Sequence, residues 1–283
     1  MLGKASGFRY VAPALAVMGG IVVYPLLQVF YLSLHRRLLI FDINQFIGLE
    51  NYRFLWQDDR FWNALKNTVY FTGVSVLAET LLGLGIALLL NRPFGLRNGV
   101  RTLILLPWAI PTVVSAKMWE WIFNPEFGVL NFLLGTKVNW LGSPWLAMLA
   151  AIFADVWKTT PFVAILLLAG LQVIPRELYQ AARVDGAGTW DLFWKITFPL
   201  LKPVLLVVLI FRTLDAWRVF DVIYVLTAGG PANTTETLSL YAYKVLFQTL
   251  QFGYGSTLSV VTFLFVGGIT VFYLSLYRRE RKH

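Results

Sequence analysis

Charged residues inside long apolar stretches are the first candidates for ligand binding in this 283-residue sequence. Within a bilayer a charged side chain costs about 2.5 to 3.5 kcal/mol on insertion scales, so such residues usually line a polar cavity or pair with each other. Each one here stands three positions from a neighbour of opposite sign. The set is Lys117, Glu120, Asp155, Lys158, Arg212, Asp215, Arg218 and Asp221.

Two interpretations of these residues stay open. Side chains three positions apart can meet on a helix surface, so the pairs can simply neutralise each other. Alternatively, they can face a cavity and bind a polar ligand. For Lys117 and Glu120 the sequence favours neither interpretation. The four residues from Arg212 to Asp221 drift around one helix by about 60° per step, so they cannot all face one narrow cavity.

The composition excludes several other kinds of chemistry. The chain has no cysteine, and its two histidines, His35 and His283, are too few and too far apart for a histidine metal cluster. A phosphate-binding loop of the GxxxxGK[ST] type does not occur, so ATP would have to be bound by another chain. No arrangement of catalytic carboxylates with a nucleophile or base can be argued either. The sequence therefore predicts no enzyme activity, no metal and no cofactor in this chain.

The elements that carry these charges are predicted to be membrane-spanning helices. Apolar residues make up 58% of the chain and charged residues only 14%, against roughly 25% charged residues in a soluble domain. A span needs about 20 mostly apolar residues. Six segments qualify: Tyr10–Leu34, Asn67–Leu90, Thr102–Phe123, Trp145–Leu171, Pro203–Ala228 and Ser256–Tyr277.

The net charge of +9 is best explained by membrane orientation, because the cations flank the apolar runs instead of forming a basic domain for nucleic acid. With the N-terminus inside, thirteen of the 24 lysines and arginines fall in inside segments and seven in outside connections. The positive-inside rule therefore predicts that both termini are cytoplasmic.

The connection from Gln172 to Lys202 differs from the short connectors. It reads QVIPRELYQAARVDGAGTWDLFWKITFPLLK. Pro175 and Glu177 favour a helix start, which predicts a short helix from Pro175 to Val184. A glycine-rich turn follows, and Thr189 can cap a second short helix that ends before Pro199. The alternative is an amphipathic helix that lies on the lipid surface.

This loop resembles the EAA signature of ABC importer permeases, which is Glu-Ala-Ala, three residues, Gly, nine residues, then Ile-x-Leu-Pro. The sequence has Gln180-Ala181-Ala182, then Gly186 and Ile196-Thr197-Phe198-Pro199 at the same spacing. With DVWKTTPF, FDVIYVLTAGGP and TTETLSLYAYKVLF, the resemblance extends from about Asp155 to Tyr277. These motifs resemble the maltose-permease type of carbohydrate importers, specifically the first of the two permease subunits.

The resemblance implies a set of partners. A second homologous permease subunit would complete a heterodimer, two ATPase subunits would bind ATP and Mg, and an extracellular or periplasmic substrate-binding protein would deliver the solute. In the family the EAA loop docks into a cleft of the ATPase. By position, the residues at that contact are Gln180, Ala181, Ala182, Asp185, Gly186 and Ala187.

The resemblance also implies a substrate site midway across a bacterial-type plasma (inner) membrane. The matching positions are Lys158, Thr159, Phe162, Arg212, Asp215, Ala216, Val219 and Asp221. We expect Arg212 and Asp215 to contact substrate and Arg218 to pair with a neighbouring charge or helix. Trp157, Trp217 and Tyr224 are further candidates for stacking on a sugar ring.

The expected architecture is an all-α integral membrane protein with six transmembrane helices and a bent cytoplasmic coupling loop, the ABC importer permease fold. Residues 1–283 are expected to form one permease domain, which includes the loop 172–202. Its expected function is half of the translocation pathway for a sugar or sugar-like solute. The alternatives are an ion-coupled secondary transporter, which would more often have ten or more spans, and a membrane enzyme.

Overall fold

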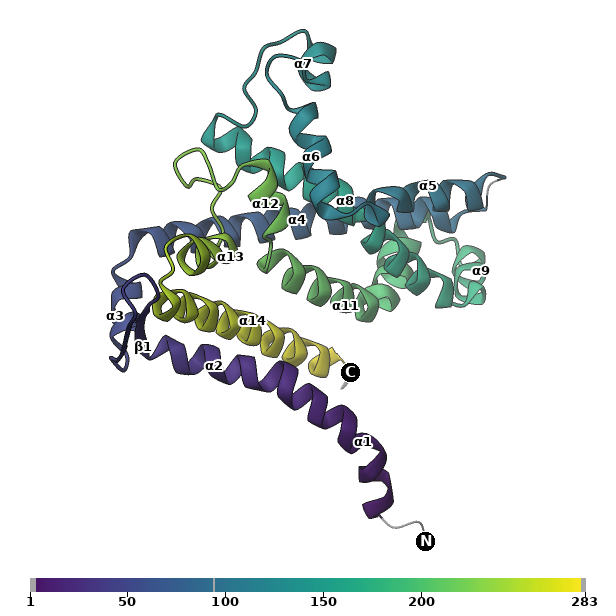
Figure 1. The fold of residues 1–283 in the computed structure, drawn as a ribbon. Coiled ribbons are helices and arrows are strands. Elements are labelled where there is room, and N and C mark those ends of the chain that lie inside the picture. Colours follow the sequence, from purple (N-terminus) through teal and green to yellow (C-terminus); the bar gives the residue numbers. More distant parts are fainter. Residues whose placement is uncertain (1–3, 94, 281–283) are drawn as a thin grey trace. The chain divides into compact units, whose positions relative to one another are not determined.

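The computed structural model describes residues 4–93 and 95–280, which are mostly helical (Figure 1). These residues form two compact units, one of residues 4–61 and 241–265 and the other of residues 62–240 and 266–280. Three helices continue from one unit into the other along the chain: α4 (Asp59–Asn91), α13 (Leu238–Tyr243) and α14 (Phe252–Glu280).

The first unit combines long apolar helices with a small polar hairpin. Its elements are α1 (Lys4–Met18), a π-helical turn (Gly19–Val23), α2 (Tyr24–Ser33), the antiparallel strands β1 (His35–Leu38) and β2 (Ile43–Phe46), α3 (Glu50–Trp56), a second π-helical turn (Lys244–Gln248) and the start of α14. The Asn51 amide donates to the carbonyls of Ser33 and His35 at 2.9 and 3.0 Å. These bonds fix the turn from α2 into β1.

Asp58 joins segments of this unit that are far apart in sequence. Its carboxylate accepts hydrogen bonds from the phenols of Tyr241, at 2.6 Å, and Tyr254. Burial, and then the bond to Asp58, raise the pKa of Tyr241 well above its usual value, so this phenol remains a donor at neutral pH.

The second unit holds most of the charged residues singled out above. Its elements are α5 (Arg97–Ala109), α6 (Thr112–Ile122), α7 (Val129–Leu134), α8 (Pro144–Val173), α9 (Arg176–Val184), α10 (Thr189–Leu192), a π-helical turn (Phe193–Thr197), α11 (Phe198–Trp217) and α12 (Asp221–Leu226), together with most of α4. Buried Val163, Leu167 and Leu171 of α8 pack with Leu201 and Val208 of α11. Gly83 of α4 lets that helix approach α8 closely, since a Cβ there would lie 2.5 Å from Val163.

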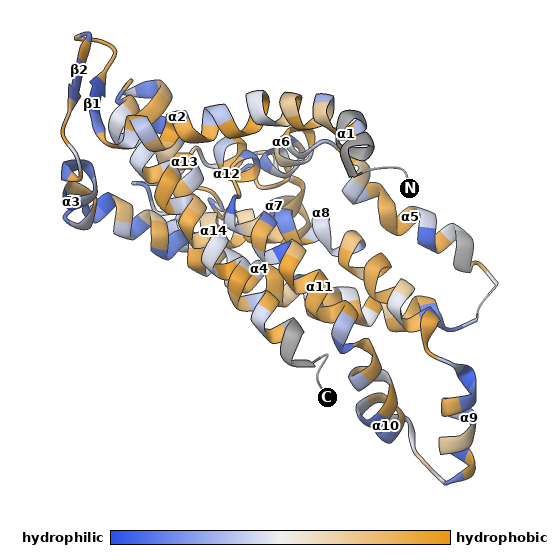
Figure 2. Ribbon diagram, turned by 90° about the horizontal axis from the view of Figure 1, so that it is seen from below, coloured by the Kyte–Doolittle hydropathy of each residue, from blue (hydrophilic) through white to orange (hydrophobic). Residues whose placement is uncertain are grey.

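Five helices among the described residues are long and apolar enough to cross a membrane, or six if the bent pair α5 and α6 counts as one span. Figure 2 shows hydrophobic residues along α2, α11 and α14, whereas α9 carries hydrophilic and hydrophobic residues together.

The prediction that the third span, Thr102–Phe123, is a single helix is wrong. Its two parts meet at 91°, because Pro111 disfavours helical geometry at Ile110, which is extended with ψ 132°.

The predicted fifth span also needs correction at both ends. The second short helix of the loop does not end before Pro199, because α10, the π-helical turn and α11 form one helix from Thr189 to Trp217. At its other end the span stops at Trp217 and not at Ala228, and α12 starts separately at Asp221. The Val219 carbonyl, freed from helix bonding, accepts a hydrogen bond from Thr237 at 3.1 Å. Asp221 therefore does not share a helix with Arg212 and Asp215.

Candidate functional site

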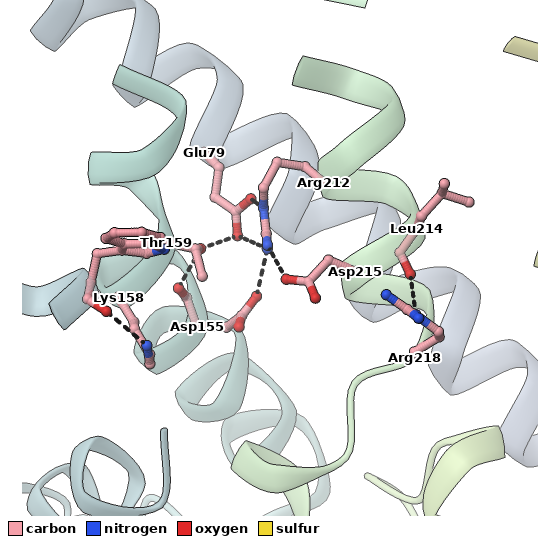
Figure 3. A network of polar contacts seen from close by, with 9 residues as sticks. Glu79, Asp155, Lys158, Thr159, Arg212, Leu214, Asp215 and Arg218 are labelled. Carbon is pink, nitrogen blue, oxygen red and sulfur yellow. Dashed lines mark hydrogen bonds and ion pairs between the residues drawn. The ribbon is translucent and has the colours of Figure 1, made fainter. Parts of the chain in front are cut away.

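A single arginine organises the polar centre of the second unit (Figure 3). Arg212 of α11 is only 3% exposed and binds Glu79 of α4 through two bonds, Nε to Oε2 at 2.5 Å and a terminal nitrogen to Oε1 at 2.9 Å. The same terminal nitrogen also reaches Asp155 at 3.4 Å, and the other terminal nitrogen bonds Asp215 at 2.5 Å. One cation thus lies among three carboxylates contributed by three helices.

Glu79 is the member of this cluster that the predicted site set lacks. Its side chain is fully buried, and Thr159 Oγ1 lies 2.7 Å from Oε1 and 2.6 Å from the carbonyl of Asp155. The signal was visible in the sequence, because Glu79 is the only charged residue between Asn67 and Leu90. A lone carboxylate in an apolar span needs a cation from elsewhere in the fold.

A cavity of about 570 Å³ opens beside this cluster, which is a usual size for a small-molecule site. All eight residues predicted to bind substrate line it: Lys158, Thr159, Phe162, Arg212, Asp215, Ala216, Val219 and Asp221. Their access differs, however. The Asp215 side chain is 65% exposed, whereas Arg212 is buried behind it. Asp215 is therefore better placed than Arg212 for a direct contact with a ligand.

Two of the remaining charges, Lys158 and Arg218, bond to backbone carbonyls and not to the partners suggested by the three-residue spacing. Lys158 donates to the Trp108 carbonyl at 3.3 Å, at the end of α5. Arg218, the C-cap of α11, donates to the Leu214 carbonyl of that same helix at 3.1 Å, so the predicted pairing with a neighbouring charge or helix is not seen in the described part of the chain. Lys117 and Glu120 do form the simple exposed pair, with an N–O distance of 2.5 Å.

Aromatic rings form part of the cavity wall. Trp108 and Phe162 stack with a centroid distance of 5.8 Å, and Phe220 and Phe211 add further apolar surface. The three aromatic residues suggested by the sequence are not among the lining residues. Trp157, for example, packs against Trp119 with a centroid distance of 5.5 Å. The wall thus offers apolar ring faces next to carboxylates and cations.

A second cavity of about 570 Å³ lies in the first unit and is lined by the hairpin, α3 and the start of α14. Its charged residues are Arg36, Arg37 and Glu50, which belong to a connection predicted to lie outside the membrane. The cavity beside Arg212 is the better candidate because it includes the charges of the spans.

The predicted coupling residues fall at the end of α9 and in the turn after it. Gln180, Ala181 and Ala182 lie in the helix, and Asp185 is its C-cap. Gly186 has a φ of +80°, with its N–H bonded to Arg183 O at 3.1 Å, while the Ala187 N–H bonds to Ala182 O at 2.9 Å. These two bonds make a Schellman motif, which ends the helix sharply and favours glycine. The tip is exposed in this chain, so its surface is available to another molecule.

Residues 79–282 match the family model described as "Binding-protein-dependent transport system inner membrane component". The chain belongs to this family. It is a multi-pass membrane protein and a transport subunit, not an enzyme, as predicted.

Relatives and solved structures extend this family assignment over nearly the whole permease. The trehalose/maltose transport system permease protein MalF of Thermococcus litoralis is 45% identical over 97% of this chain and 94% of that protein. The sulfoquinovosyl glycerol transport system permease protein SmoG of Agrobacterium fabrum is 41% identical over 95% of this chain and 89% of that protein.

Two crystal structures of a bacterial alginate ABC transporter match 96% of this chain at 25% identity. The TM-scores are 0.86 and 0.85, over 94% and 93% of those chains, and one structure is a complex with an alginate pentasaccharide-bound periplasmic protein. The predicted permease fold and importer function are confirmed. The alternative of an ion-coupled secondary transporter is not supported.

Proposed function

We propose that the cavity beside Arg212 is this chain's half of a translocation pathway for a sugar. The observation that carries this proposal is the convergence of all eight predicted binding residues on one cavity of suitable size. Its exposed carboxylate can accept hydrogen bonds from sugar hydroxyls, and such charge-assisted bonds are strong. The stacked Trp108 and Phe162 offer an apolar face beside it for the carbon side of a sugar ring.

The charge of the lining favours a neutral sugar over an anionic one. Three acidic and three basic residues line the cavity, so the lining has no excess of basic residues. Arg212 is already engaged by Glu79, Asp155 and Asp215, so this cation is not available to a ligand carboxylate or sulfonate. Without a cationic excess, the site has little to attract an anion. Trehalose, maltose and lactose appear in the names of several relatives, and all three are neutral sugars.

The remaining parts of the importer are proposed from the family resemblance and the exposed loop. A second homologous permease subunit completes the pore, and two ATPase subunits bind ATP and Mg and receive the tip of α9. A substrate-binding protein docks on the opposite side of the membrane. The excess of cations in one set of connections supports an orientation with both termini and α9 in the cytoplasm.

The test is ATP-driven uptake in proteoliposomes that contain this chain, the second permease and the ATPase, with the binding protein supplied outside. Labelled trehalose, maltose and lactose are compared with a sulfonated sugar. We expect uptake of at least one neutral disaccharide, abolished when ATP is replaced by a non-hydrolysable analogue. Uptake of the sulfonated sugar alone would overturn the neutral class, and uptake without ATP would overturn the mechanism.

A further inference from the structure

The motif LTAGGP, residues 226–231, opens a loop that the cavity and the coupling helix do not account for. In Figure 1 this loop, residues 227–237, joins α12 to α13. Ala228, Ala232 and Asn233 have φ values of +49°, +49° and +60°, which residues other than glycine seldom adopt. Such a backbone persists only where its surroundings hold it in place. The bonds that hold this loop therefore indicate what it positions.

The second half of the loop is bound to α4. The side-chain amide of Asn67 donates to the carbonyl of Glu236 at 3.0 Å and to that of Asn233 at 3.3 Å. Further along the chain, the N–H of Leu238 donates to the hydroxyl of Thr68 at 2.9 Å. Asn67 and Thr68 are themselves buried. Residues 236–238 are thus fixed to a long helix at both ends.

Thr237 lies between these two anchors and bonds to a different element. It is fully buried, and its hydroxyl donates to the Val219 carbonyl at 3.1 Å. Val219 lies in the break between the end of α11 at Trp217 and the start of α12 at Asp221. One side chain therefore joins the segment anchored on α4 to the point where helical structure is interrupted.

The interrupted segment is part of the cavity wall. Residues 218–222 all line the cavity beside Arg212, and they include Val219 and Asp221 of the predicted substrate set. Beyond the break, α12 packs against α6 and α8. A buried carbonyl that lost its donor would need another hydrogen-bond partner, and this segment faces the cavity, where water can enter. Without the bond from Thr237, the wall would therefore shift toward the cavity.

We propose that Thr237 is a positioning residue for the sugar site. Through the Val219 carbonyl it holds the wall from Arg218 to Val222 in the shape that receives the ligand. Thr237 acts without touching the ligand, because it is fully buried and is not among the described residues that line the cavity. Its anchors on α4 order the wall in advance, which lowers the cost of ordering it when a sugar binds. This inference rests on the proposed function of the cavity.

Two substitutions separate the hydroxyl from the bulk of the side chain. Thr237→Val keeps the shape but removes the donor, so we expect ATP-driven uptake at low sugar concentration to fall about threefold to tenfold. Thr237→Ser keeps the donor and should retain most of the uptake. Thr234→Val is the control, because the Thr234 hydroxyl bonds to the Pro231 carbonyl at 2.6 Å, within the loop, and not to the wall. Equal uptake with Thr237→Val and Thr237→Ser, whether normal or lost, would overturn the proposal.

A readout without substrate keeps the test independent of transport. Phe220→Cys places the single thiol of this chain in the wall segment, and its rate of labelling by a maleimide is measured in the purified importer. We expect labelling to be at least about threefold faster when Thr237→Val is added, and unchanged when Thr234→Val is added. A lower melting temperature with unchanged labelling would show a purely stabilising role and overturn the proposal. Failure of the unmodified importer to transport any sugar would instead overturn the proposed function, whatever the labelling shows.

Discussion

At the scale of single residues, the cluster around Arg212 separates a structural role from a binding role. Glu79 and Arg212 are buried against each other, whereas Asp215 holds one oxygen on Arg212 and is otherwise open to the cavity. Arg212 thus fixes the orientation of Asp215. A carboxylate held in this way can accept hydroxyl hydrogen bonds without losing much conformational freedom on binding.

Replacing Asp215 by Asn keeps its shape and hydrogen-bonding capacity but removes the charge. Bonds to charged groups contribute about 1.5 to 3 kcal/mol and neutral ones about 0.5 to 1.5, so we expect sugar uptake to fall about tenfold at low substrate concentration. Subunit assembly and basal ATP hydrolysis should stay close to normal. Arg218→Gln is the comparison within the same cavity, because Arg218 also lines it but bonds only to the Leu214 carbonyl among the described residues. Normal uptake with Asp215→Asn and no uptake with a well-expressed Arg218→Gln would reverse the assignment.

Removing Glu79 tests the structural half of the cluster. Glu79→Ala removes both bonds from Glu79 to the buried Arg212, and breaking a buried pair costs about 3 to 5 kcal/mol. Glu120→Ala breaks an exposed pair with Lys117 and should cost under about 1 kcal/mol. Thermal unfolding of the two detergent-purified variants measures the difference. Similar melting temperatures would show that Glu79 does not hold this part of the fold.

Spacing alone predicts some of these partners and cannot predict others. It correctly suggests the pairs Lys117 with Glu120 and Arg212 with Asp215, because residues three apart on a helix are neighbours. The bond from Arg212 to Glu79 joins positions 133 residues apart, which no local rule detects. Asp155 bonds to Arg212 and not to Lys158, and Lys158 donates to the Trp108 carbonyl.

At the scale of elements, the end of α9 is shaped for a contact with another molecule. Gly186→Asp adds a charged side chain at the exposed turn, where we expect docking of the ATPase. The variant should weaken assembly or uncouple ATP hydrolysis from uptake. Gly188→Asp is the control variant. It places the same side chain two residues away, at the N-cap of α10, where aspartate is favourable and the backbone φ is an ordinary −73°. Normal uptake and normal ATPase stimulation with Gly186→Asp would remove this turn from the mechanism.

The boundaries of elements were predictable where a residue imposes them. Gly186 marked the end of α9 correctly. Proline did not predict helix ends reliably. Pro111 bends the third span, whereas Pro199 lies in the first turn of α11, after a π-helical turn, and does not end the helix. The break between Trp217 and Asp221 contains neither glycine nor proline, and it is stabilised by the tertiary bond from Thr237 to Val219.

Glycines in apolar helices were similarly ambiguous. Gly83, Gly85, Gly267 and Gly268 all lie in apolar helices, where a glycine permits close helix packing. Gly83 does so against Val163, whereas the other three have nothing within 4 Å of a Cβ in this chain. Sequence identifies where a close approach is possible, and only the fold decides which of these positions is used.

At the scale of the whole molecule, the predicted orientation depends on the cation count and can be tested with cysteine chemistry. The chain has no cysteine, so an introduced one is the only reactive thiol in it. Thr189→Cys places it at the exposed start of α10. An impermeant thiol reagent added outside intact cells should not label it, whereas the same reagent should label it in inverted membrane vesicles. Labelling in intact cells would contradict the orientation.

The same absence of cysteine gives the most direct test that the cavity beside Arg212 is the transport pathway. Phe162→Cys places a thiol in the cavity wall, and Phe153→Cys places one on the exposed part of the same helix outside it. Each is labelled with a bulky maleimide in proteoliposomes holding the full importer, and ATP-driven uptake is compared before and after labelling. We predict that labelling abolishes uptake in Phe162→Cys, that saturating sugar slows this labelling, and that Phe153→Cys transports equally well labelled or unlabelled. Full uptake by a completely labelled Phe162→Cys importer would contradict the account.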